Sequence, residues 1–314
     1  MLGILATSVL TSPLRLAERL LWGRRVRRTA IDAAPIFIQG FARSGTTHLH
    51  NLIAHDPNLG YVSTFQAFAS PFFMVSRGWL QRLIGKGLPS TRPMDNMAVS
   101  LDLPQEEEFA LAAVSDLSAV HQLSFPRRAK EIVAKMGAMR LTAREMSRWG
   151  SCYLDVLRKA TLATGGRRLV LKTPANLGRT PVLLRLFPDA KFVFIVRNPY
   201  VVFCSTMKLY RTMIPMCQLQ DVNWRDIRGV HDRQLRRHDA PLPSPPLVDS
   251  EGELGRSALR GHRERSPGVS RGDLRHLGAP RLGPGSRAYC RLRGDARQLP
   301  QEPLSVRPNP HRDG

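Results

Sequence analysis

The segment that decides the fold is Gly40–Thr47, with the sequence GFARSGTT, and it follows the apolar run Pro35–Gln39, PIFIQ. The run predicts a buried strand, the two glycines predict a tight turn, and a helix is expected to begin near Gly45. A strand, a turn and a helix in this order direct backbone N–H groups and the positive end of the helix dipole at one anion. The segment therefore predicts a phosphate-binding loop.

The side chains of this loop add further hydrogen-bond donors. Arg43 supplies a guanidinium with several donors in a fixed geometry, while Ser44, Thr46 and Thr47 supply hydroxyl groups. The pattern is close to the P-loop motif G-x-x-x-x-G-K-[ST], but Thr46 stands where that motif requires lysine. The alternative is a tight turn with an ordinary helix cap. The strand before it and the helix after it favour the phosphate loop.

A second candidate phosphate site follows the apolar run 191–196, KFVFIV, which predicts a parallel strand buried on both faces. Arg197 comes directly after this strand, and Ser205 lies eight residues further on. Parallel sheets bind ligands at the carboxyl ends of their strands. A P-loop NTPase would carry an aspartate here to hold Mg²⁺, whereas an arginine and a serine describe a phosphate site that needs no metal. Taken alone, an arginine that follows a strand is more often a solvated strand end or a salt-bridge partner.

The remaining pattern alternates between strands and helices. Apolar spacing predicts a strand at Arg168–Lys172 and helices at Glu106–Val120, Ala143–Ala163, Pro181–Phe187 and Pro199–Tyr210. Alternation of this kind predicts an α/β fold. We expect a P-loop-like three-layer sandwich, with a central parallel sheet flanked by helices and truncated at its C-terminal end.

Two of these stretches together resemble sulfotransferases that use 3′-phosphoadenosine-5′-phosphosulfate (PAPS). Residues 41–53, FARSGTTHLHNLI, look like the 5′-phosphosulfate loop of that family, and residues 192–206, FVFIVRNPYVVFCST, look like its 3′-phosphate motif. The resemblance runs from about Pro35 to Trp224. It is closer to the bacterial branch, as residues 92–96, RPMDN, and 101–111, LDLPQEEEFAL, indicate.

The resemblance implies a role for each matching residue. The 5′-phosphate would be held by Arg43, Ser44, Gly45, Thr46 and Thr47, and the 3′-phosphate by Arg197 and Ser205. Lys172 matches a family lysine on the strand near the sulfuryl group, and it would neutralise charge there together with Arg43. Cytosolic members of the family carry a catalytic histidine two residues after this lysine. Pro174 occupies that position here, so the base must come from elsewhere.

The candidate base is one of three adjacent glutamates, Glu106, Glu107 and Glu108, at the start of a predicted helix. Three consecutive side chains on a helix cannot all face one cleft, so at least one is expected to point to solvent. We favour Glu106, with Glu108 second. The plain alternative is that all three merely stabilise the helix N-terminus. The implied reaction is an in-line transfer of a sulfuryl group to an acceptor hydroxyl or amine, without a metal.

Charge and composition divide the chain of 314 residues and net charge +22 into unlike parts. Residues 1–228 carry 31 basic and 15 acidic side chains, and residues 229–314 carry 16 and 10. The second part holds 16 Arg, 11 Pro and 11 Gly, but no Lys, Ile, Phe, Met or Trp. This is not the composition of a segment with a core, so we expect a disordered tail.

We hypothesise that a one-nucleotide shift of the reading frame produced this tail. With permitted codons, residues 253–263 can be reread one base forward as NLVEVRYEDIE, which resembles a strand and acidic motif of the same family. An excess of Arg, Pro and Gly is also typical of GC-rich DNA read out of frame. The domain prediction is therefore an N-terminal helix at 1–32, a sulfotransferase domain at 33–228 and an out-of-frame tail at 229–314, with weak or absent activity for this exact polypeptide.

The N-terminal helix combines leucines with arginines, which makes it a candidate for peripheral contact with a membrane. The alternative is a helix that simply packs on the domain. No stretch reaches the length of about 18 apolar residues that a membrane span needs. The cysteines show no metal-binding or disulfide pattern, so a cytoplasmic location is expected.

Two other classes of function stay open at this point. One is a P-loop kinase or NTPase, against which Thr46 and the missing aspartate count. The other is a nucleic-acid-binding protein, suggested by the charge, but no recognised binding module is present and no nucleic-acid partner is expected. The acceptor is expected to be a small molecule, a lipid or a carbohydrate.

Overall fold

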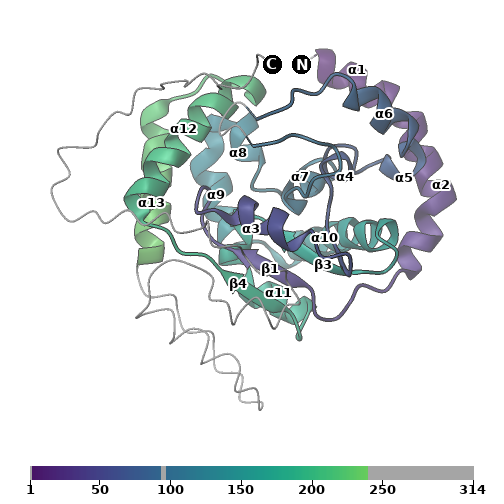
Figure 1. Cartoon of the computed structure of the whole chain (residues 1–314). Coiled ribbons are helices and arrows are strands. Elements are labelled where there is room, and N and C mark those ends of the chain that lie inside the picture. The colour runs from purple at the N-terminus through teal and green to yellow at the C-terminus, as the bar shows by residue number, and fades with distance from the viewer. Residues whose placement is uncertain (1, 93–96, 240–314) are drawn as a thin grey trace, which may run out of the picture. The chain divides into compact units, whose positions relative to one another are not determined.

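The computed structural model describes residues 2–92 and 97–239 of the chain. Within them lies a parallel sheet with the strand order β2-β3-β1-β4 (Figure 1). Its strands are β1 (Ile36–Gln39), β2 (Leu59–Gly60), β3 (Arg168–Lys172) and β4 (Lys191–Phe194). In the register, Ile38 of β1 lies opposite Lys172 of β3 and Val193 of β4, so the carboxyl ends of these three strands meet at one edge of the sheet.

Helices and short helical turns make up most of the remaining described chain. In chain order they are α1 (Leu2–Leu10), α2 (Ser12–Arg28), α3 (Thr46–Ile53), α4 (Thr64–Phe68), α5 (Phe73–Ser76), α6 (Trp79–Gly85), α7 (Glu107–Ala112), α8 (His121–Ser124), η1 (Pro126–Arg128), α9 (Ala129–Gly137), α10 (Ala143–Ala163), η2 (Pro174–Gly178), α11 (Thr180–Leu186), α12 (Pro199–Cys217) and α13 (Trp224–Asp239).

Alternate side chains of the central strands build two separate cores. Phe37 of β1 and the leucines of β3 point to one face, where they pack against Trp149 of α10 and Leu183 of α11. Ile36 and Ile38 point to the other face, where α3 covers them. This is the period-two alternation that a strand buried on both faces requires. The predicted arrangement of a central parallel sheet flanked by helices is confirmed.

The predicted helix Glu106–Val120 is wrong in length, because α7 ends at Ala112. The chain then turns back on itself, and the backbone N–H of Ala119 and the hydroxyl of Ser118 donate to the carboxylate of Glu108. A continuous helix would carry residues 118 and 119 away from that carboxylate. The buried charge of Glu108 therefore favours a turn over further helix.

The prediction that the strand 191–196 is buried on both faces is also wrong. β4 ends at Phe194, its first residue is exposed and the others are half-buried. Among the described residues it pairs with β1 and lies at the edge of the sheet. The apolar run is typical of a strand with a neighbouring strand on each side. Among the described residues, β4 has such a neighbour, β1, on one side.

The predicted domain boundary at residue 228 falls inside α13, which continues to Asp239. Ile227 and Val230 of this helix are buried against the rest of the domain. The expectation of a disordered, out-of-frame tail concerns residues that for the most part, from 240 on, lie outside the described residues. Among the described helices, none combines the length and apolar character that crossing a membrane would require.

Candidate functional site

The segment 40–45 forms a tight loop between β1 and α3. Gly45 has φ of +102° and Arg43 has φ of +71°, both in the left-handed region that residues with a side chain seldom adopt. The Ser44 hydroxyl donates to the carbonyl of Phe41, 2.7 Å away, and so braces the loop from inside. The loop therefore holds its conformation through its own contacts, and α3 begins directly after it at Thr46.

Gly40 sits where the loop approaches the end of β4 most closely. A Cβ atom added here would lie 2.8 Å from Oγ of Ser44 and 2.9 Å from the carbonyl oxygen of Ile195. The second of these neighbours is backbone and cannot rotate away, so only glycine fits this position. The close approach holds the loop against the strand end that carries Arg197.

The two predicted phosphate motifs contact each other through side chains. Nε of Arg43 donates to Oγ of Ser205 on α12 across 3.1 Å, and Nη1 of Arg197 donates to the backbone carbonyl of Arg43 across 3.0 Å. Arg43 is half-buried and Arg197 is exposed. Ser205 and Arg197 thereby contact Arg43, although they lie 162 and 154 positions after it in the sequence.

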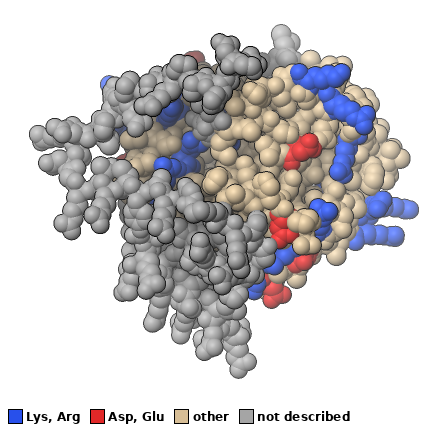
Figure 2. Space-filling model, in the orientation of Figure 1, with Lys and Arg blue, Asp and Glu red and all other residues tan. Residues whose placement is uncertain are grey.

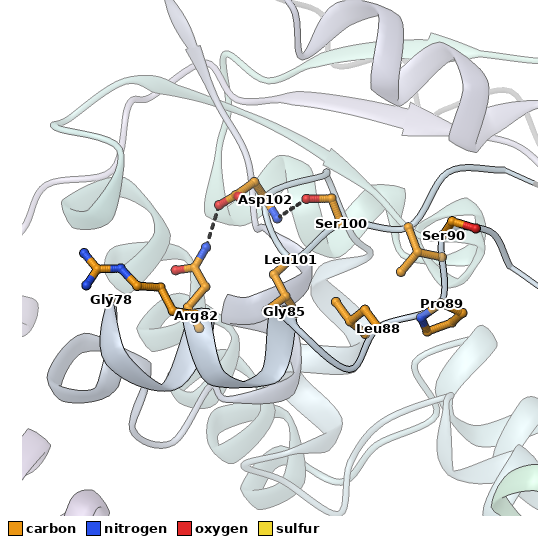
Figure 3. Close-up of a pocket in the computed structure, with 11 residues that line it drawn as sticks. Gly78, Arg82, Gly85, Leu88, Pro89, Ser90, Ser100, Leu101 and Asp102 are labelled. Carbon is orange, nitrogen blue, oxygen red and sulfur yellow. Dashed lines mark hydrogen bonds between the residues drawn. The ribbon is translucent and has the colours of Figure 1, made fainter.

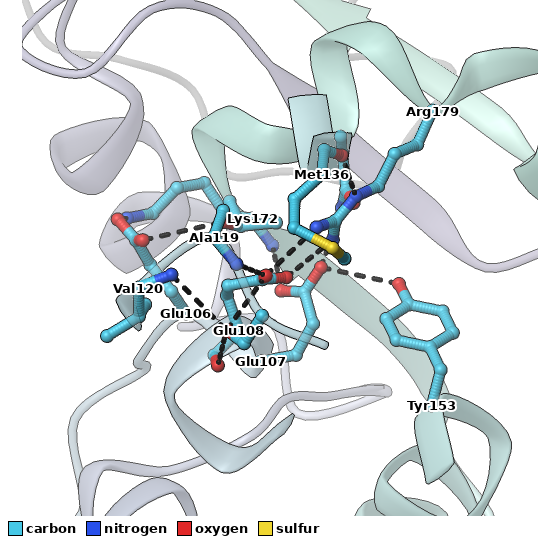
Figure 4. Close-up of polar contacts among 12 residues, drawn as sticks. Glu106, Glu107, Glu108, Ala119, Val120, Met136, Tyr153, Lys172 and Arg179 are labelled. Atoms are coloured by element: carbon cyan, nitrogen blue, oxygen red, sulfur yellow. Dashed lines mark hydrogen bonds and ion pairs between the residues drawn. The ribbon is translucent and has the colours of Figure 1, made fainter. Parts of the chain in front are cut away.

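Lys172 is the third cation at this edge of the sheet. It ends β3, and its Nζ atom lies 2.5 Å from Oε1 of Glu106 and 3.3 Å from Oγ1 of Thr47 in the loop. The other oxygen of Glu106 accepts from the Thr173 hydroxyl across 3.4 Å. Lys172 is buried, whereas the Glu106 side chain stays partly accessible. The predicted residues Glu106, Thr47 and Lys172 therefore form one connected group, of which Figure 4 shows Glu106 and Lys172.

Glu107 points into the core beside this group, and no role was predicted for it. It accepts from the backbone N–H of Lys172, from Asn176 across 2.6 Å and from the Tyr153 hydroxyl across 3.3 Å. The pKa of Glu107 is raised to about 7, chiefly because burial disfavours the carboxylate; hydrogen-bond donors lower it in part, and the neighbouring Glu108 and Glu106 contribute to the rise. Glu107 therefore ties the end of β3, and with it Lys172, to the core.

Glu108 lies in a buried ion pair with Arg179, and neither side chain has appreciable exposure. Nη2 of Arg179 donates to Oε1 of Glu108 across 2.9 Å, and the guanidinium also lies over the ring of Trp149. Burial by itself raises the pKa of Glu108, but the charge and hydrogen bonds of Arg179, with the donors at Ala119 and Ser118, lower it overall. The structure does not place Glu108 with the loop residues.

The expectation that at least one of the three glutamates points to solvent is wrong. Glu107 and Glu108 are buried and Glu106 is partly buried, and Figure 4 shows the three side chains diverging to different partners. The partners come from β3, from η2 and from Arg179 just after it. Residues 174–179, PANLGR, carry two of these polar partners, Asn176 for Glu107 and Arg179 for Glu108, and they were the signal available in the sequence.

A groove of about 510 Å³ lies apart from this group, along α6 and the segment 99–102 (Figure 3). Arg82 and Asp102 lie on its walls, and Gln81 donates to Asp102 across 2.6 Å. No residue of the 40–47 loop or of the glutamate run lines it. The segment 99–102 leads through Leu103 and Pro104 to Gln105 and Glu106, so the groove is connected to the glutamate run along the chain.

The fold and the site together define the class of this protein. Its parallel sheet carries, at the strand ends, a braced glycine loop and three cations. The class is that of α/β proteins with a site suited to an anion, because backbone donors and cations converge at the strand ends. A carboxylate within reach of the lysine adds a group that can accept a proton.

Comparison with known proteins identifies the family. The model of the sulfotransferase family matches residues 35–242, two thirds of the chain, and the chain belongs to this family. The resemblance predicted from residues 41–53 and 192–206 is thereby confirmed.

Several mycobacterial sulfotransferases are similar to this chain. Omega-hydroxy-beta-dihydromenaquinone-9 sulfotransferase Stf3 of Mycobacterium bovis and of Mycobacterium tuberculosis is 32% identical over 213 residues, which are 68% of this chain and 54% of the relative. The crystal structure of sulfotransferase STF1 from M. tuberculosis is similar in fold, with a TM-score of 0.51 and 19% identity over 72% of this chain and 63% of that one. The chain thus spans about half the length of the curated relatives it matches.

Proposed function

We propose that this protein transfers a sulfuryl group from PAPS to the hydroxyl group of a small molecule or lipid. The observation that carries the proposal is the group formed by Lys172, Glu106 and Thr47. The Lys172 cation lies within hydrogen-bond distance of both the partly accessible carboxylate of Glu106 and the hydroxyl of Thr47 in the 40–47 loop. A transfer from an anionic donor to a hydroxyl needs these three kinds of group at one point.

The residues present fit a nucleotide that carries phosphate groups at two ends. The loop 40–47 offers backbone N–H groups at the start of α3 for one phosphate. Arg197 and Ser205 offer donors for the second, and Arg43 bridges the two motifs through Ser205. The hydroxyl and the backbone N–H of Ser44 both already donate to the carbonyl of Phe41, so in this proposal Ser44 supports the loop conformation.

In this proposal Glu106 is the general base. Its carboxylate takes the proton of the acceptor hydroxyl, while Lys172 neutralises charge that develops during transfer. The paired, buried position of Glu108 favours a structural role for that residue, which leaves Glu106 as the carboxylate at the loop. Arg43 is proposed to stabilise charge on the departing phosphate.

For the acceptor we propose a lipid-like hydroxyl compound. The Stf3 relatives are named for a hydroxylated dihydromenaquinone, and they share 32% identity with this chain over most of the described domain. A carbohydrate or another small hydroxyl compound is the other outcome that an acceptor screen would reveal. A kinase or NTPase is not favoured, since the chain belongs to the sulfotransferase family.

Ligand binding is the first test, because it does not require full activity. Thermal unfolding is followed with 3′,5′-adenosine bisphosphate, with ATP and Mg²⁺, and with an oligonucleotide. Stabilisation by the bisphosphate alone is the expected result, and R197Q should abolish most of it. The matched control is R211Q, which removes an exposed arginine further along α12. Stabilisation by ATP or the oligonucleotide instead, or equal loss in both variants, would contradict the proposal.

Turnover is the second test. Release of 3′,5′-adenosine bisphosphate from PAPS is measured with long-chain alcohols, a hydroxylated isoprenoid quinol, simple sugars and amines. We expect the lipid-like alcohols to be sulfated best. We also expect a low rate for residues 1–314 as they stand, and a higher rate once residues 229–314 are replaced by the reading of the neighbouring frame.

A further inference from the structure

The outward face of α2 is both apolar and basic. Leu16, Leu20 and Leu21 are exposed, the latter two at 72% each. The arginines of the helix are all exposed as well, and they are Arg15, Arg19, Arg24, Arg25, Arg27 and Arg28. Figure 2 shows Lys and Arg side chains gathered along the edge of the molecule that α2 occupies in Figure 1. Exposed leucines among cations are typical of helices that lie in a lipid headgroup region.

A buried contact fixes which side of α2 faces outward. Glu18, the only acidic residue in the sequence of this helix, is turned inward and is almost fully buried. It accepts the backbone N–H of Met74 across 2.8 Å and pairs with Lys159 of α10. The helix is therefore held in one rotational position, and the face opposite Glu18 carries arginines without a compensating acid of its own.

The short helix α6 adds an aromatic anchor to the same part of the fold. Trp79 and Leu83 lie one turn apart and are exposed at 53% and 63%. Gly78, Arg82 and Gly85, on another side of this helix, line the groove described above. α2 packs on α5 and α5 on α6, and Figure 1 shows all three along one edge. Tryptophan is favoured where an apolar region meets water.

We propose that α2 and α6 dock this protein on the surface of an anionic lipid bilayer. The leucines of α2 and Trp79 enter the headgroup region, and the arginines contact lipid phosphates. Charge complementarity selects this occupant over a neutral apolar partner, because six exposed arginines surround the leucines. The inference goes beyond the proposed reaction and does not rest on it, since binding can be measured without PAPS or an acceptor.

Vesicle co-sedimentation of the full chain tests the proposal. We expect binding to phosphatidylglycerol-rich vesicles and at least tenfold weaker binding to phosphatidylcholine vesicles, with a steep loss as salt is raised. L16S/L20S/L21S and R24Q/R27Q/R28Q should each weaken binding at least tenfold. Their matched controls remove exposed residues elsewhere, and these are V114S/M216S/L219S and R140Q/R144Q/R211Q. Because all variants keep residues 229–314, the charge of that segment cancels in the comparison.

Trp79 gives a second, local readout. The W22F/W224F variant keeps two tryptophans, Trp79 and the buried Trp149. Its emission is compared with that of the same variant carrying W79F in addition. We expect a blue shift and quenching by brominated lipid that disappear in W79F. Equal vesicle binding by the α2 variants and their controls would overturn the proposal. So would a wild-type dimer in light scattering, without vesicles, that the α2 leucine variant dissociates, because the face would then be an interface between two copies.

Discussion

Lys172 and Glu106 form an ion pair, with 2.5 Å between Nζ and Oε1, at the point where β3 ends and α7 begins. The hydroxyl of Thr47 in the 40–47 loop lies 3.3 Å from the same nitrogen. The pair therefore couples the carboxylate proposed as base to the loop proposed to hold the donor. Removing either partner should affect the reaction in a different way.

For E106Q we expect kcat to fall by about 10²–10⁴-fold, since the amide cannot accept the acceptor proton. Binding of 3′,5′-adenosine bisphosphate should change little, because Glu106 has no role in holding it. Initial rates and thermal shifts measured on the same preparation separate the two effects. The control is E131Q, which neutralises an exposed glutamate on α9. A kcat for E106Q equal to that of E131Q would remove Glu106 as the base.

Glu107 should make folding stability depend on pH. Its pKa is about 7 in the folded chain against an ordinary value of 4.5, so the folded protein keeps a proton that the unfolded chain has released. The free energy of unfolding should then fall as pH rises from about 4.5 to 7, by about 3 kcal/mol, and stay lower above that range. E107Q should lack this decline. Urea unfolding of both proteins at several pH values gives the difference curve, from which all other titrating groups cancel. Parallel curves would show that the pKa of Glu107 is the same in the folded and unfolded chains, which would contradict the prediction.

The Glu108–Arg179 pair should be a stability element rather than a catalytic one. E108Q leaves the buried guanidinium without its counter-charge and should reduce the free energy of unfolding by about 3–5 kcal/mol. The double variant E108L/R179M should lose much less, because no buried charge remains. Chemical denaturation of the three proteins measures this. A larger loss in the double variant than in E108Q would contradict the expectation, and so would a specific loss of kcat in a stable E108Q protein.

The loop conformation should matter for binding more than for folding. G45A forces a side chain into φ of +102° and should destabilise the loop by about 1–2 kcal/mol. Affinity for 3′,5′-adenosine bisphosphate should fall at least tenfold, since the backbone donors at the start of α3 shift. G166A, at φ of +86° after α10, carries a similar strain far from the loop in sequence. It should lower stability and leave affinity unchanged. Calorimetric titration decides, and similar affinities for the two variants would count against the loop as the phosphate site.

The composition of residues 229–314 leads to a prediction about DNA. Nucleotide sequence across codons 226–232, determined on independently prepared DNA, should reveal one inserted or missing base. An intact frame found repeatedly would refute the frameshift and leave the Arg-, Pro- and Gly-rich segment as a true part of the protein.

Local pattern was sufficient for the elements that make the sheet and its loop. β3 and α10 begin and end where apolar spacing predicts, and α10 starts with a capping box in which Thr142 and Glu145 bond each other's backbone N–H groups. The meeting of Arg43 with Arg197 was also predictable, since parallel strands place their carboxyl ends at one edge.

The fate of the glutamate run was not predictable from spacing alone. Helical geometry requires three neighbouring side chains to diverge, but it does not determine which residues each of them contacts in the folded chain. Arg179 and Asn176 belong to a segment some seventy residues away, as the sequence separations of 71 and 69 from their partners show. Tertiary contacts of that range decide burial, and burial in turn decides whether a carboxyl group is paired, neutral or accessible.

The three diverging glutamates have one further consequence, which concerns rotation. Successive residues of a helix are rotated by about 100° from one another. The contacts of Glu107 and Glu108, with that of Glu106 at the N-cap, therefore fix one orientation of α7. Inserting a single residue between Pro104 and Glu106 leaves the composition and the helix propensity nearly unchanged. Deleting one within α7 would instead take all of its later side chains out of phase with their partners at once. The segment should therefore tolerate the substitution of one glutamate better than a deletion within α7.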